Sequence, residues 1–176
     1  AQYPDRLTGL AHGREWLIYA DPDGSIATVE RAVNEQGLSG LHFLPPQLDL
    51  YGYDGPWDAP EFLPFWDGVA SLGIPVFFSL KERRPPVMES YLQEVATLVR
   101  WMERYPDVPV VMTHGMGWRM FIEGDGLNIN EDLWSAFDNP NLHLQWLFPI
   151  GLGSVWDYPM PQVRSTIEDC VSRIGA

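Results

Sequence analysis

The sequence predicts an α/β fold in which parallel strands alternate with helices. Five apolar runs start 32, 36, 34 and 33 residues apart, and helical patterns occupy the intervals between them. Connections from a helix into the next strand are short, whereas those that leave a strand are long and rich in aromatic, glycine and proline residues. The five runs cover residues 6–12, 38–44, 74–80, 108–114 and 141–147.

Two architectures accommodate five such units. Five strands make a complete flavodoxin-like sheet, and they also make five units of a (β/α)8 TIM-like barrel, whose full length is about 250 residues. A flavodoxin-like protein that binds phosphate carries a glycine-rich turn after its first strand, and residues 12–24 lack one. We therefore predict a partial barrel, with residues 1–176 as a single domain.

The individual elements are predicted from their apolar patterns. The five runs are apolar nearly throughout, which is typical of parallel strands covered by helices. Two of the helical patterns end at Gly37 and Gly73, and glycine is the residue favoured just beyond a helix. The expected helices cover residues 25–36, 60–72, 88–104, 131–137 and 161–173.

The long connections indicate where the protein functions. In open α/β sheets and in barrels, ligands bind on the loops that follow the carboxyl ends of the strands. These loops carry many aromatic residues, which either wall a pocket that accepts a ring or cap the open end of the sheet. The aromatic residues at or after strand ends are Tyr51, Tyr53, Trp57, Trp118, Trp146, Trp156 and Tyr158.

Composition excludes several classes of function. A net charge of −13 with only 11 basic residues argues against nucleic-acid binding. No apolar run approaches the roughly 18 residues of a membrane span, and the amino terminus does not resemble a signal peptide. The single cysteine, Cys170, excludes a disulfide within the chain and is expected in the core. We expect a cytoplasmic protein that acts on a small-molecule substrate and binds neither nucleic acid nor a membrane. Whether it forms a homo-oligomer stays open.

The ends of the chain suggest a segment of a longer protein. The sequence does not begin with methionine, and a strand begins by residue 6. The last helical pattern stops at Ile174, where a connection would normally lead into another strand.

Histidines supply the first candidates for chemistry. His12 and His114 end their apolar runs, which places them at the rim where the strands end. His114 is the candidate catalytic residue, because Gly115 and Gly117 follow it and leave room for a ligand beside a neutral imidazole. His42 and His143 lie within their runs and face either the barrel interior or the helices.

Other chemical signals are weaker. Lys81 follows the third run and could orient an anionic substrate, although exposed lysines are usually solvated. Metal-binding motifs such as HxH and HExxH are absent from the sequence, as are the P-loop and the GxSxG nucleophile elbow. The residues themselves leave the metal ligands unknown.

Six segments along the whole chain carry a resemblance to a known family: YPDRLTGLAH at 3–12, ERAVNEQGLSGLHF at 30–43, FLPFWDGVASLGIPVFF at 62–78, RYPDVPVVMTHGMG at 104–117, NPNLHLQ at 139–145 and WDYP at 156–159. Together they resemble the amidohydrolase-related family, in particular the branch of aminocarboxymuconate semialdehyde decarboxylase, related aromatic-acid decarboxylases and lactone hydrolases.

The resemblance implies a (β/α)8 barrel with a divalent metal, commonly zinc or manganese. In the family an HxH pair on strand 1, a histidine ending strand 5 and an aspartate after strand 8 bind the metal, and a histidine ending strand 6 activates the metal-bound water. Aligned this way, the chain runs from about strand 3 to the helix before strand 8. His114 matches the strand 6 histidine, and Ser79 stands where the family has its strand 5 metal ligand.

The resemblance further implies an enzyme, either a metal-dependent hydrolase or a carboxy-lyase that decarboxylates, acting on a small carboxylated or cyclic, aromatic substrate. His114 would transfer the proton. Two alternatives stay open: a family member that has lost metal chemistry, because of Ser79, and a non-catalytic five-stranded α/β binding module. The substrate contacts expected are Ser79, Lys81, His12, Tyr51, Trp118 and Gln145.

Overall fold

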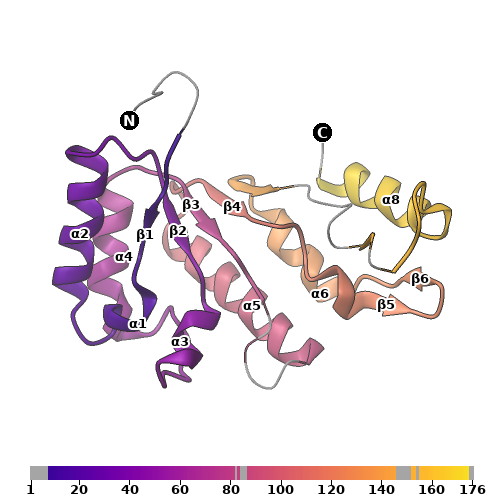
Figure 1. Ribbon diagram of the computed structural model, residues 1–176, viewed down its shortest axis with the longest axis horizontal. Coiled ribbons are helices and arrows are strands. Elements are labelled where there is room, and N and C mark those ends of the chain that lie inside the picture. The colour runs from indigo at the N-terminus through magenta and orange to yellow at the C-terminus, as the bar shows by residue number, and fades with distance from the viewer. Residues whose placement is uncertain (1–7, 82, 84–86, 146–151, 154, 175–176) are drawn as a thin grey trace.

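The computed structural model contains one parallel sheet of five strands in the order β1-β2-β3-β4-β7 (Figure 1). The structure describes residues 8–81, 83, 87–145, 152–153 and 155–174. Parts of the predicted end strands, and Trp146, lie outside these residues. The strands are β1 (Ala11–His12), β2 (Leu41–Phe43), β3 (Val76–Phe78), β4 (Val110–Met112) and β7 (Leu142–Leu144).

The strands are shorter than the apolar runs that predict them. Each lies inside its run, and backbone hydrogen bonds extend the pairing by about one residue at either end. Thus the N–H of Leu41 bonds to the carbonyl of Pro75, and that of Val76 bonds to the carbonyl of Pro109. The runs were too long as predictions because apolar residues such as Ile74, Leu80 and Val108 are buried beside the strands without belonging to them.

Helices follow the strands as predicted, with small shifts at the ends. The helix α2 begins earlier than expected because Pro22 occupies its first turn and the Asp21 carboxylate caps Gly24 N–H at 3.0 Å. Both Gly37 and Gly73 follow their helices with positive φ, as predicted. The helices are α2 (Pro22–Asn34), α4 (Leu63–Ser71) after the 3₁₀ turn Pro60–Phe62, α5 (Met88–Arg104), α6 (Glu131–Trp134) with the 3₁₀ turn Ser135–Asp138, and α8 (Arg164–Ile174) after the 3₁₀ turn Pro161–Val163.

The long loops contain short elements that the sequence did not predict. A helix α1 (Glu15–Ile18) follows β1 and a helix α3 (Pro46–Leu50) follows β2, and the two contact each other at the carboxyl ends of these strands (Figure 1). After β4, the turn Trp118–Phe121 leads into a hairpin of β5 (Ile122–Glu123) and β6 (Gly126–Leu127). Elements of two to five residues are too short to show a hydrophobic period.

Helices α4 and α5 cover the same face of the sheet. Phe78 of β3 packs against Trp66 of α4 and Trp101 of α5, with ring centroids 6.0 and 5.2 Å apart. Ile26 of α2 lies against Gly68 of α4, so α2 belongs to the same layer. A flavodoxin-like sheet has helices on both faces. One helical layer over sequential parallel strands is instead the arrangement of a barrel segment.

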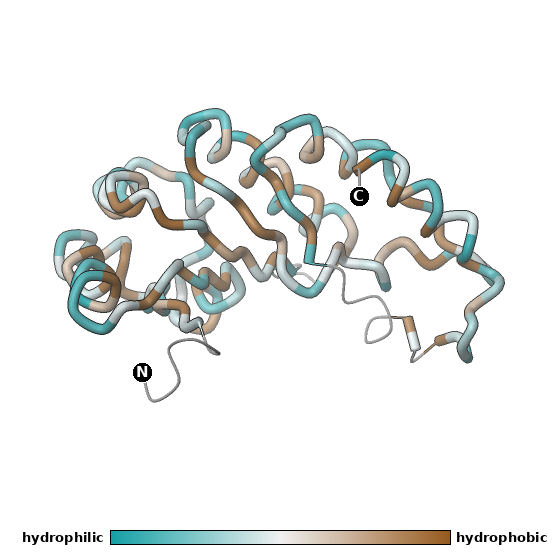
Figure 2. The backbone as a smooth tube through the Cα atoms, turned by 90° about the horizontal axis from the view of Figure 1, so that it is seen from above, coloured by the Kyte–Doolittle hydropathy of each residue, from teal (hydrophilic) through white to brown (hydrophobic). Residues whose placement is uncertain are grey.

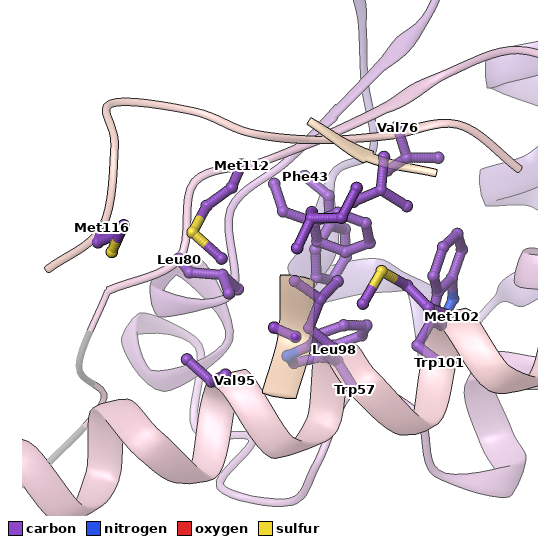
Figure 3. Packing of buried hydrophobic residues seen from close by; sticks show 14 of the residues in the cluster. Phe43, Trp57, Val76, Leu80, Val95, Leu98, Trp101, Met102, Met112 and Met116 are labelled. Carbon is purple, nitrogen blue, oxygen red and sulfur yellow. The ribbon is translucent and has the colours of Figure 1, made fainter. Parts of the chain in front are cut away.

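The core lies between that layer and the sheet. In Figure 3, Val95, Leu98, Trp101 and Met102 of α5 point toward side chains of the strands such as Phe43. All of these side chains are at most 2% exposed. Figure 2 shows the hydrophobic colour along the central strands and an alternation of hydrophilic and hydrophobic residues along the helices. Cys170 of α8 is buried as predicted, and no helix among the described residues is long and apolar enough to span a membrane.

A buried arginine ties together the loops that follow β2 and β3. The Arg83 guanidinium donates to Asp49 Oδ1 at 2.9 Å and to the backbone carbonyls of Tyr53 and Gly55. It also lies 3.7 Å from Oε1 of Glu94 on α5, whose other oxygen accepts from Trp57 Nε1 at 2.8 Å. These contacts hold the β2 loop against the body of the protein.

Glu94 makes the stability of the protein depend on pH. Burial raises the pKa of Glu94 from 4.5 to about 7, against the hydrogen bond from Trp57 and the charge of Arg83. The folded chain therefore holds a proton that the unfolded chain releases, and the free energy of unfolding falls as pH rises between about 4.5 and 7, by on the order of 3 kcal/mol. We expect Glu94→Gln to remove this part of the pH dependence, measured by urea unfolding at pH 5 and pH 8.

The matched control is Glu103→Gln, which changes an exposed carboxylate on the same helix. Its unfolding free energy should follow the wild-type pH dependence. A Glu94→Gln protein that loses as much stability between pH 5 and pH 8 as the wild type would contradict this account.

Candidate functional site

The face of the sheet opposite the helices presents several polar side chains toward the carboxyl ends of the strands. The paired residues His12, His42, Phe77, Val111 and His143 lie in one cross-strand row that is only partly covered. Side chains alternate between the two faces of a strand, so residues two positions further on share this face. Among these residues are Ser79, Thr113 and Gln145.

Three of these side chains form a hydrogen-bonded chain across β2, β3 and β4. Ser79 Oγ lies 2.7 Å from His42 Nε2 and 2.6 Å from Thr113 Oγ1. The Thr113 hydroxyl donates to the carbonyl oxygen of Phe78 at 3.1 Å. Thr113 then accepts from Ser79, and Ser79 accepts from His42, which assigns the proton of His42 to Nε2. The Nδ1 of His42 is left with its lone pair.

The surroundings of His42 favour its neutral form. Burial lowers the pKa of His42, and the nearby charges of His12 and His114 lower it further. The rings of His12 and His42 meet edge to face with their centroids 5.9 Å apart. Three histidines thus converge on this edge of the sheet: His12 of β1, His42 of β2 and His114, which follows β4.

His114 sits in a left-handed backbone conformation directly after β4. Its φ is 64°, and its backbone N–H donates to Gln145 Oε1 at 3.0 Å. Gln145, at the end of β7, therefore holds the turn that presents the exposed His114 ring. Histidine is one of the few side chains that tolerate a positive φ.

Gly115 packs the same turn against Trp118. Its φ is 79°, and a Cβ placed on it would lie 2.6 Å from Trp118 Nε1. We expect Gly115→Ala to destabilise the protein by about 1–3 kcal/mol, because it adds both strain and a clash. Thermal unfolding monitored by circular dichroism measures this.

Gly52→Ala is the control for backbone strain alone. Gly52 also has a positive φ, 85°, but no atom lies within 4 Å of a Cβ placed there. The loss of stability should be clearly smaller than for Gly115→Ala. Equal losses at the two positions would show that Trp118 does not press on Gly115.

Aromatic rings border the edge next to His12. Trp16 of α1 stacks on Tyr51 with centroids 4.7 Å apart, and the ring of Trp16 lies 6.4 Å from that of His12. Tyr51 is 53% exposed. Of the other aromatic residues predicted at strand ends, Trp57 and Trp156 are buried in the core, and Tyr158 is 91% exposed.

The predicted site residues do not all lie together. His12, Ser79, His114 and Gln145 share the edge, and Tyr51 borders it through Trp16. Lys81 is exposed just after β3. Trp118 is only 3% exposed and packs in the core against Gly115, so the structure places it behind the turn. The roles of these residues in substrate binding stay predictions.

Four residues of the site were not singled out from the sequence. The sequence did not decide on which face of the sheet His42 lies, and only the register of the strands places it beside Ser79. Thr113 precedes His114 and lies two residues beyond Val111. This spacing could have predicted that Thr113 and Val111 lie on the same face of the sheet. Glu15 and Trp16 belong to the short helix α1, which the sequence did not predict. Burial raises the pKa of Glu15, whose carboxyl group lies 3.5 Å from Nδ1 of His12.

The side chains present do not make the metal site that the resemblance implies. No group of three or more His, Cys, Asp or Glu among the described residues is placed to hold a metal ion. At the strand 5 position, Ser79 is 2% exposed and its hydroxyl is already bonded to His42 and Thr113. Zinc and manganese sites need imidazole, carboxylate or thiolate ligands, which Ser79 does not replace.

Comparison with known families accounts for the fold. The chain matches the family model described as Amidohydrolase over residues 1–175. Comparison with curated proteins and with solved structures found no match. The family's domain is a TIM barrel, so the five-stranded parallel sheet is part of such a barrel, as predicted, and members of its superfamily are usually metal-dependent hydrolases or lyases. The chain belongs to the amidohydrolase family.

Proposed function

We propose that the chain carries the proton-transfer side of the active site of a hydrolase or carboxy-lyase that acts on a small carboxylated or cyclic, aromatic substrate. The observation that supports this is the convergence of His12, His42 and His114 at the carboxyl edge of the sheet. Active sites of barrel enzymes lie at this edge. The resemblance to the decarboxylase and lactone hydrolase branch supports the same two reactions.

His114 is the proton-transfer residue in this proposal. Its ring is exposed and its backbone is held by Gln145, so the imidazole is both accessible and positioned. A neutral imidazole accepts a proton from an attacking water or returns one to the product near pH 7. The bonded chain from His42 through Ser79 to Thr113 fixes the floor of the site beside it.

The neighbouring side chains suit the substrate class. The stacked pair of Trp16 and Tyr51 offers an aromatic surface to a ring of the substrate. Lys81 and His12 are exposed groups that can face a carboxylate in a chain of net charge −13. Steps at a metal are not assigned to these residues, because the described donors do not form a metal site.

A product assay on the protein tests this proposal. We would incubate it with a panel of aryl lactones and of aromatic and unsaturated carboxylic acids, with and without added Zn²⁺ or Mn²⁺. Release of acid from a lactone indicates a hydrolase, and release of carbon dioxide indicates a carboxy-lyase. Absence of turnover on the whole panel under all metal conditions would contradict the proposal.

A second function has one specific observation in its favour. Ser79 replaces the expected metal ligand and its hydroxyl is fully engaged, which favours a family member that binds its ligand without metal chemistry. Titration calorimetry with Zn²⁺ and Mn²⁺, followed by titration with the acids of the panel, separates the two. Binding of an acid with neither turnover nor metal uptake would support this second function.

A further inference from the structure

A buried carboxyl group lies beside His12 at the carboxyl end of β1. Glu15 is 0% exposed, and its Oε1 accepts a hydrogen bond from the Leu44 backbone N–H at 2.7 Å. Its Oε2 has no hydrogen-bond partner among the described residues and lies 3.5 Å from His12 Nδ1. The His12 side chain is 48% exposed. The carboxyl group of Glu15 is thus closed to water, whereas the ring of His12 faces the site.

The cost of an isolated buried charge limits the protonation states of this pair. An ionised Glu15 beside a neutral His12 would leave a buried carboxylate without a counter-charge, which costs several kcal/mol. Two arrangements avoid this: a protonated carboxyl that donates to Nδ1, and a carboxylate that accepts from an imidazolium. Both place one proton between Oε2 and Nδ1, and both are neutral overall.

Both arrangements leave the second proton on Nε2 of His12. When Nδ1 accepts the hydrogen bond, the neutral ring carries its proton on Nε2, and the imidazolium carries protons on both nitrogens. The backbone N–H of Arg14 also points at Nδ1, at 3.3 Å, which favours the accepting form. Nε2 is thus a donor in either state.

We propose that Glu15 is a positioning residue that keeps Nε2 of His12 protonated, so that His12 donates a hydrogen bond to an oxygen of the substrate. This role rests on the proposed function, because that function identifies the edge as the substrate site. It gives His12 and His114 opposite tasks: His12 donates, and His114 accepts the proton.

The surroundings of the pair agree with this assignment. Among the described residues, three titratable or charged groups surround the pair. Arg14 lies between Glu15 and His12 in the chain, His42 lies on β2, and His114 lies beyond His42. Burial raises the pKa of Glu15, and the charge of His12 opposes that rise. The lowered pKa of His42 favours its neutral form.

Nuclear magnetic resonance of the protein tests the assignment directly. The ¹⁵N shifts of His12 should show a protonated Nε2 from pH 5 to pH 8. Glu15→Gln should keep this tautomer, because its amide group can donate to Nδ1, whereas Glu15→Leu should yield a mixture of tautomers. A wild-type ring protonated on Nδ1 alone at any of these pH values would overturn the proposal.

A second variant keeps the test independent of whether Glu15→Leu folds. In His12→Gln, the ¹³C shift of the Glu15 carboxyl should titrate at a higher pH than in the wild type, since the charge of His12 that lowers the Glu15 pKa is lost. An unchanged midpoint would also overturn the proposal. Neither measurement uses turnover, so a silent substrate panel would contradict the proposed function and leave the tautomer that Glu15 imposes on His12 standing.

Discussion

Replacing His114 by asparagine should lower kcat/KM by about 10²- to 10⁴-fold, because it removes the imidazole that transfers the proton. Asparagine tolerates the left-handed backbone at this position, where φ is 64°, so the turn and its bond to Gln145 should survive. The measurement is turnover of the best substrate of the panel. Thermal unfolding should stay close to that of the wild type.

His143→Asn is the matched control for His114→Asn. His143 is exposed like His114, but it pairs with Val111 of β4, which lies three positions before His114 in the chain. Its replacement should change kcat/KM by less than about threefold. If His114→Asn kept near wild-type turnover while His143→Asn abolished it, the proton-transfer role would belong to the other histidine.

Replacing Arg83 by methionine should destabilise the protein by about 3–5 kcal/mol, because it leaves buried acidic groups without their counter-charge. The guanidinium is 93% buried, contacts Asp49 and Glu94, and donates to the carbonyls of Tyr53 and Gly55. Methionine fills similar space but donates no hydrogen bond. Urea unfolding at pH 8, where Glu94 is ionised, measures the loss.

Two further variants separate charge from packing at this site. Arg100→Met removes an ion pair with Asp58 in which the arginine is 52% exposed, and it should cost no more than about 1 kcal/mol. The double variant Arg83→Met, Glu94→Gln should recover part of the loss, since one of the uncompensated charges is gone. A loss for Arg83→Met no larger than that for Arg100→Met would contradict the counter-charge role.

The helices were predictable from the sequence because their apolar faces repeat with the helical period, and the strands because they are short continuous apolar runs between those helical patterns. The run around Val110 and the amphipathic pattern of α5 needed no partner to be recognised. The face on which His42 lies was not predictable, because a strand that is apolar on both sides shows no alternation. Helix α1, with Glu15, is a single turn and shows no period either.

The sequence by itself determined the parallel strands, the edge that carries the long loops, and His114 as the residue at the end of the fourth strand. Local patterns suffice for these, since hydrophobic periodicity and glycine stops act over a few residues. Only the tertiary structure decided that one layer of helices covers the sheet, that Ser79 bonds to His42 and Thr113, and that Glu15 lies against His12. These depend on strand register and burial, which bring together residues that are distant in sequence and shift their protonation through the loss of water.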